Sequence, residues 1–373
     1  MTTPSTENII NYLSDTFGSD IHGSELNQAS RHFDISYQTI TKRLDNYKVE
    51  RGHWDLSKKV DQMENSYHSK SATPSQTFIP TVDDTFVPFG SFSDIKKIVK
   101  SNLFYPTFIT GLSGNGKTFS VEQVCAQLGR EFMRVNVTIE TDESDLIGSL
   151  RLDDPNGNTI TTWHDGPVVQ AMKRGAILLL DEVDLASNKI LCLQPVLEGK
   201  GLFIKMTGEY VKPAPGFNIF ATANTKGQGS PDGRFIGTNI MNEAFLERFP
   251  VTFEQQYPST SIELKILTKV SEQVGVDDND FCMRLIQWAR RSRSLFDDDR
   301  VSGELISTRR LVSIIRAYSI WGKKEKALEV CLNRFSDEIK ESFMEAYDKY
   351  DENFELNPDT TSEEVPNYVL DKI

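Results

Sequence analysis

A glycine-rich octapeptide is the feature that most constrains the fold of this chain. Residues 111–118 read Gly-Leu-Ser-Gly-Asn-Gly-Lys-Thr, which fits the pattern G-x-x-x-x-G-K-S/T. In this pattern backbone N–H groups surround phosphate oxygens, the lysine meets the outer phosphates and the hydroxyl binds Mg²⁺. Residues 105–110 favour a β-strand, and residues 119–128 space their apolar side chains as a helix does. Strand, glycine loop and helix in this order predict a phosphate-binding site in an α/β domain.

Two acidic residues after a second predicted strand complete this site. Residues 177–180 are all apolar and do not alternate, which is typical of a central strand buried on both faces. Asp181 and Glu182 follow directly. Taken alone, the pair could equally be a helix cap, but after a phosphate loop two carboxylates at a strand end can meet Mg²⁺ and the attacking water. We therefore expect Asp181 to bind Mg²⁺ through its water shell and Glu182 to orient and polarise the water.

The candidate nucleotide ligands come from these two motifs. The alternative interpretation of the loop is a glycine turn with an incidental lysine. We expect Thr118 and Asp181 to hold Mg²⁺. The residues expected to bind the nucleotide are Gly111, Ser113, Gly114, Asn115, Gly116, Lys117, Thr118, Phe119 and, through Mg²⁺, Asp181.

The composition limits the possible partners and the compartment. The 373 residues carry a formal net charge of -13, which argues against an extended basic surface that coats nucleic acid. The four cysteines are far apart, and buried reduced thiols are expected rather than disulfides or a zinc site. The first residues lack the pattern of a signal peptide, and the longest dense apolar run, residues 176–180, is too short to span a bilayer. We expect a cytoplasmic protein with no membrane contact.

The first 56 residues predict a small helical module. Apolar residues are spaced three and four apart in residues 7–17, 24–33 and 36–47, which indicates three short helices. Such a unit resembles a helix-turn-helix, whose last helix enters a major groove of DNA. Acidic residues such as Asp45 dilute the positive charge, so a module that docks a partner protein stays an open alternative. The polar and basic residues of the third helix are Tyr37, Gln38, Thr39, Lys42 and Arg43.

Composition and periodicity divide the chain into five parts. A polar stretch in which Ser, Thr and Pro accumulate is typical of a linker, and the acidic end of the chain lacks the apolar content to fold alone. In order, we expect a helical module at 1–56, a linker at 57–81, a nucleotide-binding domain at 82–256, a helical lid at 257–350 and an acidic tail at 351–373.

Further segments belong to the predicted nucleotide-binding domain. Residues 145–163 and 201–212 each place two β-prone arms around a turn, which indicates two hairpins. Residues 218–224 form another buried strand, which ends in the polar Asn224. Residues 82–99 contain several aromatic side chains, and we expect this segment to pack against the nucleotide base.

The order of these features resembles that of AAA+ ATPases. It runs phosphate loop, hairpin, strand ending in Asp-Glu, hairpin, strand ending in Asn, Glu-Arg-Phe and helical lid. More narrowly, the chain resembles the clade of the MoxR chaperones, the magnesium chelatase motor subunit and the aerobic cobaltochelatase subunit CobS. The CobS likeness is closest through residues 221–249, and the whole resemblance spans roughly residues 82–320. It implies an α/β fold with a parallel sheet, two hairpin inserts and a C-terminal helical lid, here preceded by a small all-α module.

The resemblance assigns roles to further residues. Asn224 resembles the sensor that hydrogen-bonds the water and the γ-phosphate, and Arg309 resembles the lid arginine of the second sensor, with Arg310 as the alternative. Arg248 resembles the finger that enters the site of the next subunit, where a guanidinium is worth roughly 10³–10⁵ in rate. Asn136 stands where the clade often has a polar residue that reorients the catalytic glutamate. The candidate catalytic set is Glu182, Asn224, Arg248 and Arg309.

These residues predict a Mg²⁺-dependent ATPase. The resemblance implies a hexameric ring that hydrolyses ATP to move its hairpins against a client, which in the resembled family is a von Willebrand A-type partner. Two alternatives remain. A DNA-directed motor of the McrB type would bind DNA through residues 1–56, although that family's Met-Asn signature is absent where Ala223 and Asn224 stand. A nucleotide-gated adaptor would bind ATP with little turnover.

Overall fold

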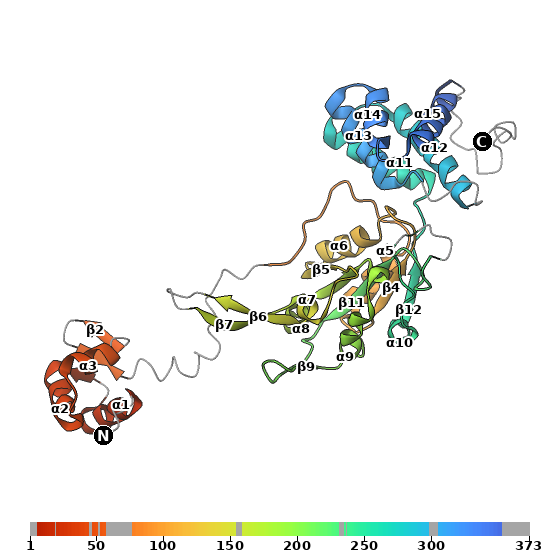
Figure 1. Cartoon of the computed structure of the whole chain (residues 1–373). Coiled ribbons are helices and arrows are strands. Elements are labelled where there is room, and N and C mark those ends of the chain that lie inside the picture. Colours follow the sequence, from red (N-terminus) through yellow and green to blue (C-terminus); the bar gives the residue numbers. More distant parts are fainter. Residues whose placement is uncertain are drawn as a thin grey trace. The chain divides into compact units, whose positions relative to one another are not determined.

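The computed structural model describes residues 6–18, 20–44, 47–50, 53–56, 77–153, 159–230, 235, 237–297 and 305–352. Contacts divide the chain into two compact units, Met1–Gln76 and Thr77–Ile373 (Figure 1). Most of the predicted linker and of the predicted acidic tail lies outside the described ranges. Within those ranges, no helix combines the length and the apolar character needed to cross a membrane.

In its described residues, the N-terminal unit combines three helices with a small sheet. In chain order it contains α1 (Thr6–Phe17), β1 (Asp20–His22), α2 (Gly23–Phe33), α3 (Tyr37–Arg43), β2 (Lys48–Glu50) and β3 (His53–Asp55). The strands pair antiparallel in the order β1-β3-β2, so the prediction of an all-α module is wrong. Each strand has only three residues, too few to show the alternation that marks a strand in sequence. Ile21 and Trp54 pair in register, and both are buried in the core of this unit.

A five-stranded sheet is the centre of the second unit. Its order is β12-β4-β11-β8-β5, and every neighbouring pair is parallel. The strands are β4 (Thr107–Thr110), β5 (Phe132–Asn136), β8 (Ile177–Asp181), β11 (Asn218–Ala223) and β12 (Val251–Glu254). The predicted α/β fold with a parallel sheet is confirmed. The two strands predicted to be buried, β8 and β11, have a neighbour on each side, and all their residues are buried.

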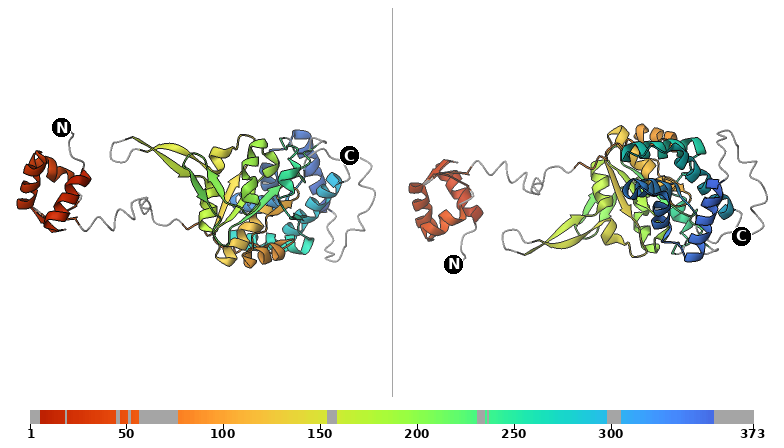
Figure 2. Two further views of the ribbon diagram at one scale, coloured as in Figure 1. Left: turned by 90° about the horizontal axis from the view of Figure 1, so that it is seen from below. Right: turned by 90° about the horizontal axis from the view of Figure 1, so that it is seen from above.

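Helices cover both faces of this sheet (Figures 1 and 2). Side chains alternate between the faces along a strand, so Leu178 and Leu179 of β8 belong to different cores. The core with Leu178 includes residues of α8 (Pro167–Arg174), α9 (Gln194–Leu197) and α10 (Glu243–Leu246). The core with Leu179 includes residues of α5 (Phe92–Ser101) and α6 (Lys117–Leu128). Three short elements complete this domain: α7 (Glu143–Leu146), η4 (Val183–Leu185) and η5 (Asn188–Leu193).

Two antiparallel hairpins extend from the domain. The first pairs β6 (Gly148–Asp153) with β7 (Ile160–Asp165), and the second pairs β9 (Leu202–Ile204) with β10 (Glu209–Val211). Both were expected from the sequence, although most of the Pro-Asn-Gly turn of the first lies outside the described residues. Apolar side chains on these hairpins are exposed: Leu150, Leu152, Ile160, Phe203, Met206 and Tyr210.

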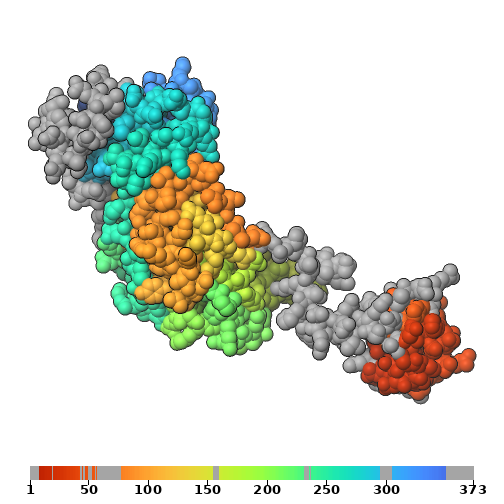
Figure 3. All heavy atoms as spheres, turned by 180° about the vertical axis from the view of Figure 1, so that it is seen from behind, coloured from red at the N-terminus to blue at the C-terminus, as the bar shows by residue number. Residues whose placement is uncertain are grey.

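Five helices form the lid at the end of this unit. They are α11 (Thr260–Val274), α12 (Asn279–Asp297), α13 (Thr308–Trp321), α14 (Lys324–Leu332) and α15 (Asp337–Glu352). The lid has its own core, in which Trp288 and Phe281 are buried. It contacts the segment before α5, because Lys269 Nζ donates to the carbonyl oxygens of Asp84 and Phe86, 2.8 and 3.3 Å away. Figure 3 shows the teal lid surface against the orange segment.

The predicted linker is shorter than its composition indicated. The second unit begins at Thr77, within the stretch 57–81 that was expected to be linker. The N–H of Phe132 on β5 donates to the carbonyl oxygen of Phe78, 2.9 Å away, and Gln123 Nε2 donates to that of Thr81, 3.2 Å away. These residues pack on the nucleotide-binding domain because Phe78 supplies apolar surface that a polar linker lacks.

Candidate nucleotide site

The phosphate loop connects β4 to α6 at the carboxyl edge of the sheet. Gly111, Gly114 and Gly116 adopt φ angles of 144°, 75° and 88°, which favour glycine. A Cβ on Gly111 would lie 2.2 Å from the carbonyl oxygen of Gln255, and one on Gly114 would lie 2.7 Å from the side chain of Ser307. The loop therefore needs glycine where β12 and the lid approach it.

Asn115 and Lys117 hold the loop in shape. Asn115 is buried, and its Nδ2 donates to the carbonyl oxygen of Gln255, 2.5 Å away. Lys117 Nζ donates to the carbonyl oxygens of Gly111 and Leu112, 2.6 and 3.0 Å away, and to Asn224 Oδ1, 3.3 Å away. Burial lowers the pKa of Lys117 to about 8, against the attraction of the Asp181 carboxylate. The ammonium group is thus surrounded by oxygen acceptors and lies beside the end of β11.

Asp181 at the end of β8 collects donors from three elements. Thr118 Oγ1 donates to Oδ1 at 2.8 Å, and Thr222 Oγ1 donates to the same oxygen. Arg134 Nη2 on β5 lies 2.5 Å from Oδ2. A buried carboxylate needs hydrogen-bond donors or a positive charge beside it, so this position favours a cation. The hydroxyl of Thr118 and the carboxylate of Asp181 fit Mg²⁺, which prefers oxygen ligands and keeps several waters.

Glu182 has an unusual backbone conformation. Its φ of 58° lies in the left-handed region, which non-glycine residues seldom adopt and which concentrates at functional sites. Its N–H donates to Thr222 Oγ1 at 3.2 Å, which ties the turn to β11. The side chain is exposed and lines the same pocket as Lys117. The turn after β8 therefore delivers two carboxylates to different places, Asp181 into the sheet edge and Glu182 to the pocket wall.

A buried carboxylate positions Asn224. Asp184 Oδ2 accepts hydrogen bonds from the backbone N–H groups of Asn224 and Thr225, at 2.9 and 3.0 Å, and from Thr225 Oγ1 at 3.1 Å. Asp184 is fully buried, so these bonds are shielded from water. Asp184 had no predicted role, although Asp184 follows Glu182 by two residues. It fixes the end of β11 and thereby places the amide of Asn224 beside Lys117.

The side chains of Lys117, Thr118, Asp181, Glu182 and Asn224 line one pocket of about 490 Å³. The predicted aromatic segment contributes Phe86 and Phe89, and the ring of Phe86 packs on the edge of Phe119 with centroids 5.2 Å apart. Glu122 lines the pocket as well, and burial raises the pKa of its carboxyl. From the lid, the lining residues are Ile266, Val270, Thr308, Arg309, Val312, Ser313 and Arg316. Such a concave site with an apolar wall and polar groups at one end suits a nucleotide.

The two adjacent arginines of α13 have different surroundings. Arg309 lines the pocket, and its backbone N–H donates to the carbonyl oxygen of Gly114 at 3.3 Å. Arg310 turns into the lid, where Nη1 donates to the carbonyl oxygen of Cys331 at 2.8 Å and the guanidinium lies over Phe335. Arg316 lies two turns beyond Arg309 on α13 and also lines the pocket. The sequence did not single it out, because a helical arginine at that spacing has no motif of its own.

Three candidate residues, Gly111, Arg248 and Asn136, are absent from the residues described as lining this pocket. Arg248 follows α10 and pairs with Glu198, its Nε and Nη2 lying 3.0 and 2.7 Å from Oε1. It also donates to the carbonyl oxygen of Ala244. Asn136 is the last residue of β5, opposite Asp181 in register. Neither the Arg248 nor the Asn136 side chain reaches the nucleotide pocket of its own subunit.

A network of lid side chains contacts the phosphate loop. The sequence did not predict it. Tyr257 Oη donates to the carbonyl oxygen of Ser113, 2.7 Å away. The guanidinium of Arg293 lies 4.0 Å from the centroid of the Tyr257 ring and pairs with Glu263 at 2.8 Å. Thr308 Oγ1 donates to the same glutamate at 2.6 Å. Because Thr308 precedes Arg309, this network connects two consecutive carbonyls of the loop, those of Ser113 and Gly114, to the lid.

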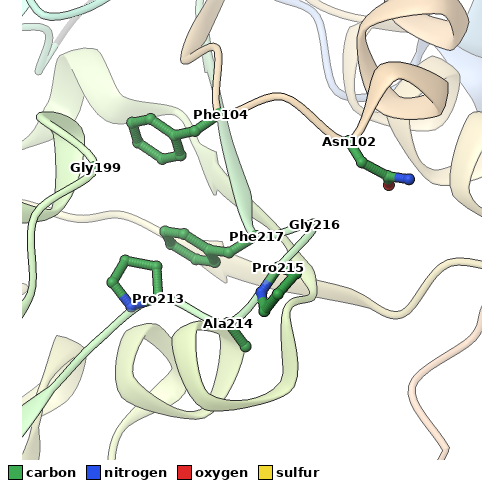
Figure 4. A pocket seen from close by; sticks show the side chains of 8 residues that line it. All are labelled: Asn102, Phe104, Gly199, Pro213, Ala214, Pro215, Gly216 and Phe217. Carbon is green, nitrogen blue, oxygen red and sulfur yellow. The ribbon is translucent and has the colours of Figure 1, made fainter.

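A second, smaller pocket has no such chemistry. It measures about 230 Å³ and lies among proline, glycine, alanine and phenylalanine residues, with Asn102 at its margin. The rings of Phe104 and Phe217 stack in it, with centroids 5.9 Å apart (Figure 4). The residues that line it include no titratable side chain, so we assign it no function.

The fold and the arrangement of these residues define a phosphate-loop ATPase. Comparison with known families agrees, because residues 106–249 match the AAA domain of the dynein-related subfamily. The chain is 27% identical to the aerobic cobaltochelatase subunit CobS of a Sinorhizobium species over 239 residues, which is 63% of this chain and 72% of that protein. The predicted resemblance is thus confirmed: the chain contains an AAA-type ATPase domain and is similar to CobS.

Other relatives extend this comparison. An uncharacterised protein of Staphylococcus saprophyticus is 28% identical over 254 residues, which is 66% of this chain and 90% of that protein. Midasin of Giardia intestinalis is 36% identical over 146 residues, but these are 39% of this chain and only 3% of midasin. Among solved structures, the RuvB Holliday junction branch migration motor of Thermotoga maritima matches with a TM-score of 0.41 and 12% identity, covering 68% of this chain and 72% of that chain.

Proposed function

We propose that this chain assembles into a ring and hydrolyses ATP to remodel a partner protein, as a CobS-like or MoxR-like motor. The observation that carries the proposal is the direct contact of Lys117 with Asn224 and of Thr118 with Asp181, with Glu182 on the same pocket wall. These contacts lie at the carboxyl edge of the sheet, where open α/β sheets bind their ligands.

In this proposal each group has one task. Lys117 and the N–H groups of the loop bind the β- and γ-phosphates, while Thr118 and Asp181 hold Mg²⁺, which neutralises charge on the phosphate oxygens when bound. Glu182 accepts a proton from the water that attacks the γ-phosphorus, and the bond from that phosphorus to the departing ADP oxygen breaks. Asn224 orients the same water. The products are ADP and phosphate.

We further propose that Arg248 acts in the pocket of the neighbouring subunit and Arg309 in its own. Arg309 lines its own pocket, whereas Arg248 pairs with Glu198 outside it. A guanidinium supplied by the next subunit makes hydrolysis depend on assembly. Six subunits would close the ring, as the CobS likeness implies. The side-chain amide of Asn136, beside Asp181 in register, would then donate a hydrogen bond to the Glu182 carboxylate when that group turns away from the water.

The hairpins are the proposed contact with the client. Leu152 on the first hairpin and Phe203, Met206 and Tyr210 on the second are 74%, 56%, 65% and 54% exposed. Exposed apolar side chains at the ends of two projecting hairpins suit transient binding of another protein. A von Willebrand A-type partner is the client class that the family likeness favours.

The thiols favour a reducing compartment, and we place the protein in the cytoplasm. All four cysteines belong to the described residues and are free thiols. Burial raises the pKa of Cys125 to about 12 and that of Cys192 to about 11, so neither is a reactive thiolate.

Phosphate release with ATP or GTP, each with and without duplex DNA, tests this function. We expect release from ATP that does not need DNA. Lys117→Ala should abolish nucleotide binding, and Glu182→Gln should bind ATP and keep the ring together without turnover. Binding without release from the unaltered chain would instead support the adaptor. A pull-down with Glu182→Gln then identifies the client that the ATP-bound ring retains.

One observation keeps a DNA-directed motor as the second candidate. In the N-terminal unit the consecutive helices α2 and α3 are followed by the antiparallel strands β2 and β3, an order that resembles a helix-turn-helix with an added hairpin. Gln38 and Lys42 of α3 are exposed and free to meet base edges or phosphates. A gel-shift comparison of the full chain with one that starts at Thr77, where the second unit begins, decides the matter, since equal affinity for duplex DNA would contradict this candidate.

A further inference from the structure

The outer face of the small N-terminal sheet brings together two histidines and an aspartate. Asp20 and His22 lie two residues apart on β1 and are exposed, whereas Ile21 between them is buried, so both point to the outer face. His53 on β3 is the register partner of His22. One ligand atom from each of the three side chains lies within 4.8 Å of the other two.

Direct contacts support this arrangement. The imidazole rings of His22 and His53 stack, with centroids 4.9 Å apart and planes 20° apart. Asp20 Oδ1 contacts Nε2 of His53. A neutral imidazole presents a lone pair on one of its two ring nitrogens. A lone pair of this kind is what a metal ion binds.

We propose that Asp20, His22 and His53 form a site for a divalent transition-metal ion, with Zn²⁺ as its test ion. Imidazole nitrogens suit zinc, copper, nickel and iron, whereas magnesium and calcium prefer oxygen ligands alone. Tetrahedral zinc with bonds of about 2.0–2.2 Å places its ligand atoms about 3.4 Å apart. The present separations of up to 4.8 Å therefore close by small rotations of side chains that lie at the surface.

A second histidine–aspartate pair in the chain shows what distinguishes this cluster. His164 Nε2 lies 2.8 Å from Asp153 Oδ2 on the first hairpin. Among the described residues, no third histidine, cysteine or carboxylate joins that pair closely enough to share an ion. Two ligands are an ordinary ion pair, whereas three with two imidazoles are a chelating set.

The consequence of metal binding is local. His22 directly precedes α2, and its backbone N–H donates to Glu25 Oε2 within the first turn, 2.6 Å away. An ion held by both strands would tie this turn to β3 and so to the β2–β3 hairpin. The site would stabilise the N-terminal unit and leave the nucleotide pocket, formed by residues of the other unit, untouched.

The test is titration of the full chain with Zn²⁺ alone as the added ligand, in buffer with excess Mg²⁺ to occupy the oxygen sites. Isothermal titration counts the ions bound, and hydrogen exchange of the amides in 20–22 and 53–55 reports where they bind. The variants are His22→Gln, His53→Gln and Asp20→Asn. The matched control is His32→Gln, because His32 is another exposed histidine of the same unit but stacks on Tyr12 outside the cluster.

We expect one Zn²⁺ per chain in the unaltered protein and in His32→Gln, with slower exchange of both strands. His22→Gln and His53→Gln should bind at least about tenfold more weakly, since even indirect supports of a metal ligand cost 10- to 100-fold. Asp20→Asn keeps the shape of the side chain and should weaken binding as well, which separates loss of a ligand from misfolding. Equal binding by His22→Gln and the unaltered chain, or protection elsewhere than in these strands, would overturn the site.

Discussion

Two arginine–glutamate pairs in the second unit have the same chemistry and different surroundings. Arg293 and Glu263 pair inside the lid, where their side chains are 8% and 0% exposed. Arg248 and Glu198 pair beside the second hairpin, where the values are 25% and 32%. The buried glutamate also accepts a hydrogen bond from Thr308, and Arg293 Nε donates to the carbonyl oxygen of Ile306.

This difference in exposure shows which ion pair holds the fold together and which ion pair can break so that its arginine binds another group. A buried ion pair loses its hydration, so neither partner can leave without stranding the other. Water screens the surface pair, which therefore contributes little to stability. Hydrogen bonds from Lys200 and Arg248 lower the pKa of Glu198, so this carboxylate stays charged near neutral pH even if one of the two leaves. Arg248 can thus leave Glu198, as its proposed role in the pocket of a neighbouring subunit requires, whereas Arg293 cannot leave Glu263.

Removing the arginine of the surface pair should have the largest effect on turnover. Arg248→Ala should lower the rate of ATP hydrolysis by roughly 10³–10⁵ and leave ATP affinity and the unfolding temperature unchanged, because the lost interaction is made in the transition state. Phosphate release and nucleotide binding measure the two parts. Arg174→Ala is the matched control, since Arg174 also forms a surface pair with a glutamate, Glu131, and does not line the pocket.

Mixing subunits tests whether that arginine acts in the next subunit. Arg248→Ala and Lys117→Ala subunits are each inactive alone, but in a mixed ring an intact arginine from one can face an intact pocket of the other. Mixing should therefore restore part of the turnover. An Arg248→Ala protein that hydrolyses ATP normally, or a mixture that stays inactive, would show that the arginine does not act across a subunit boundary.

Removing the glutamate of the buried pair should have the largest effect on stability. Glu263→Ala leaves the Arg293 guanidinium buried without a counter-charge, which costs about 3–5 kcal/mol of unfolding free energy. Faster hydrogen exchange in α11, α12 and α13 measures the loss within the lid. Replacing both partners by methionine should recover most of it, because an apolar pair of similar volume needs no counter-charge. If Glu263→Ala lowered the unfolding free energy by no more than the loss of a surface ion pair does, the contrast between the buried and the surface pair would be contradicted.

The sequence predicted the parts of the site that are contiguous. The loop from Gly111 to Thr118 and the Asp181–Glu182 pair are local patterns with a local chemical reason, and residues 113–118 of the loop line one pocket with both acidic residues. The sequences of β8 and β11 indicated strands buried on both faces, and the AAA+ resemblance implied the parallel sheet. Arg134, Asp184 and Arg316 stayed hidden, because their contacts depend on which strands and helices become neighbours.

Short elements and long-range contacts account for the remaining differences. The three-residue strands of the N-terminal unit carry too little pattern to be recognised, and the pairing of His22 with His53 exists only through their register. Tyr257 is the first residue of the predicted lid, and its bond to Ser113 joins residues that are 144 positions apart. Such contacts follow from the packing of the lid on the loop, which no local spacing encodes.

A smaller effect on ATP affinity should follow from removing one hydrogen bond between the lid network and the phosphate loop. Tyr257→Phe removes the hydrogen bond to Ser113 but keeps the ring on which Arg293 stacks. One such bond is worth about 1 kcal/mol, so ATP affinity should fall by about fivefold with little change in the turnover of bound ATP. Tyr210→Phe, on the exposed hairpin, is the control. Unchanged ATP affinity in Tyr257→Phe would mean that the network only stabilises the lid.

The smallest effect should come from neutralising the glutamate of the surface pair. Glu198→Gln keeps the shape of the side chain and an oxygen that accepts hydrogen bonds, and Arg248 retains its bond to the carbonyl oxygen of Ala244. Because Arg248 must leave Glu198 to reach a phosphate, turnover should change by less than about fivefold and the unfolding temperature should not shift. Phosphate release by Glu198→Gln, measured beside Arg248→Ala, makes the comparison direct. If Glu198→Gln lost as much turnover as Arg248→Ala, Glu198 would be holding the arginine in its working position. The surface pair would then be as fixed as the buried pair.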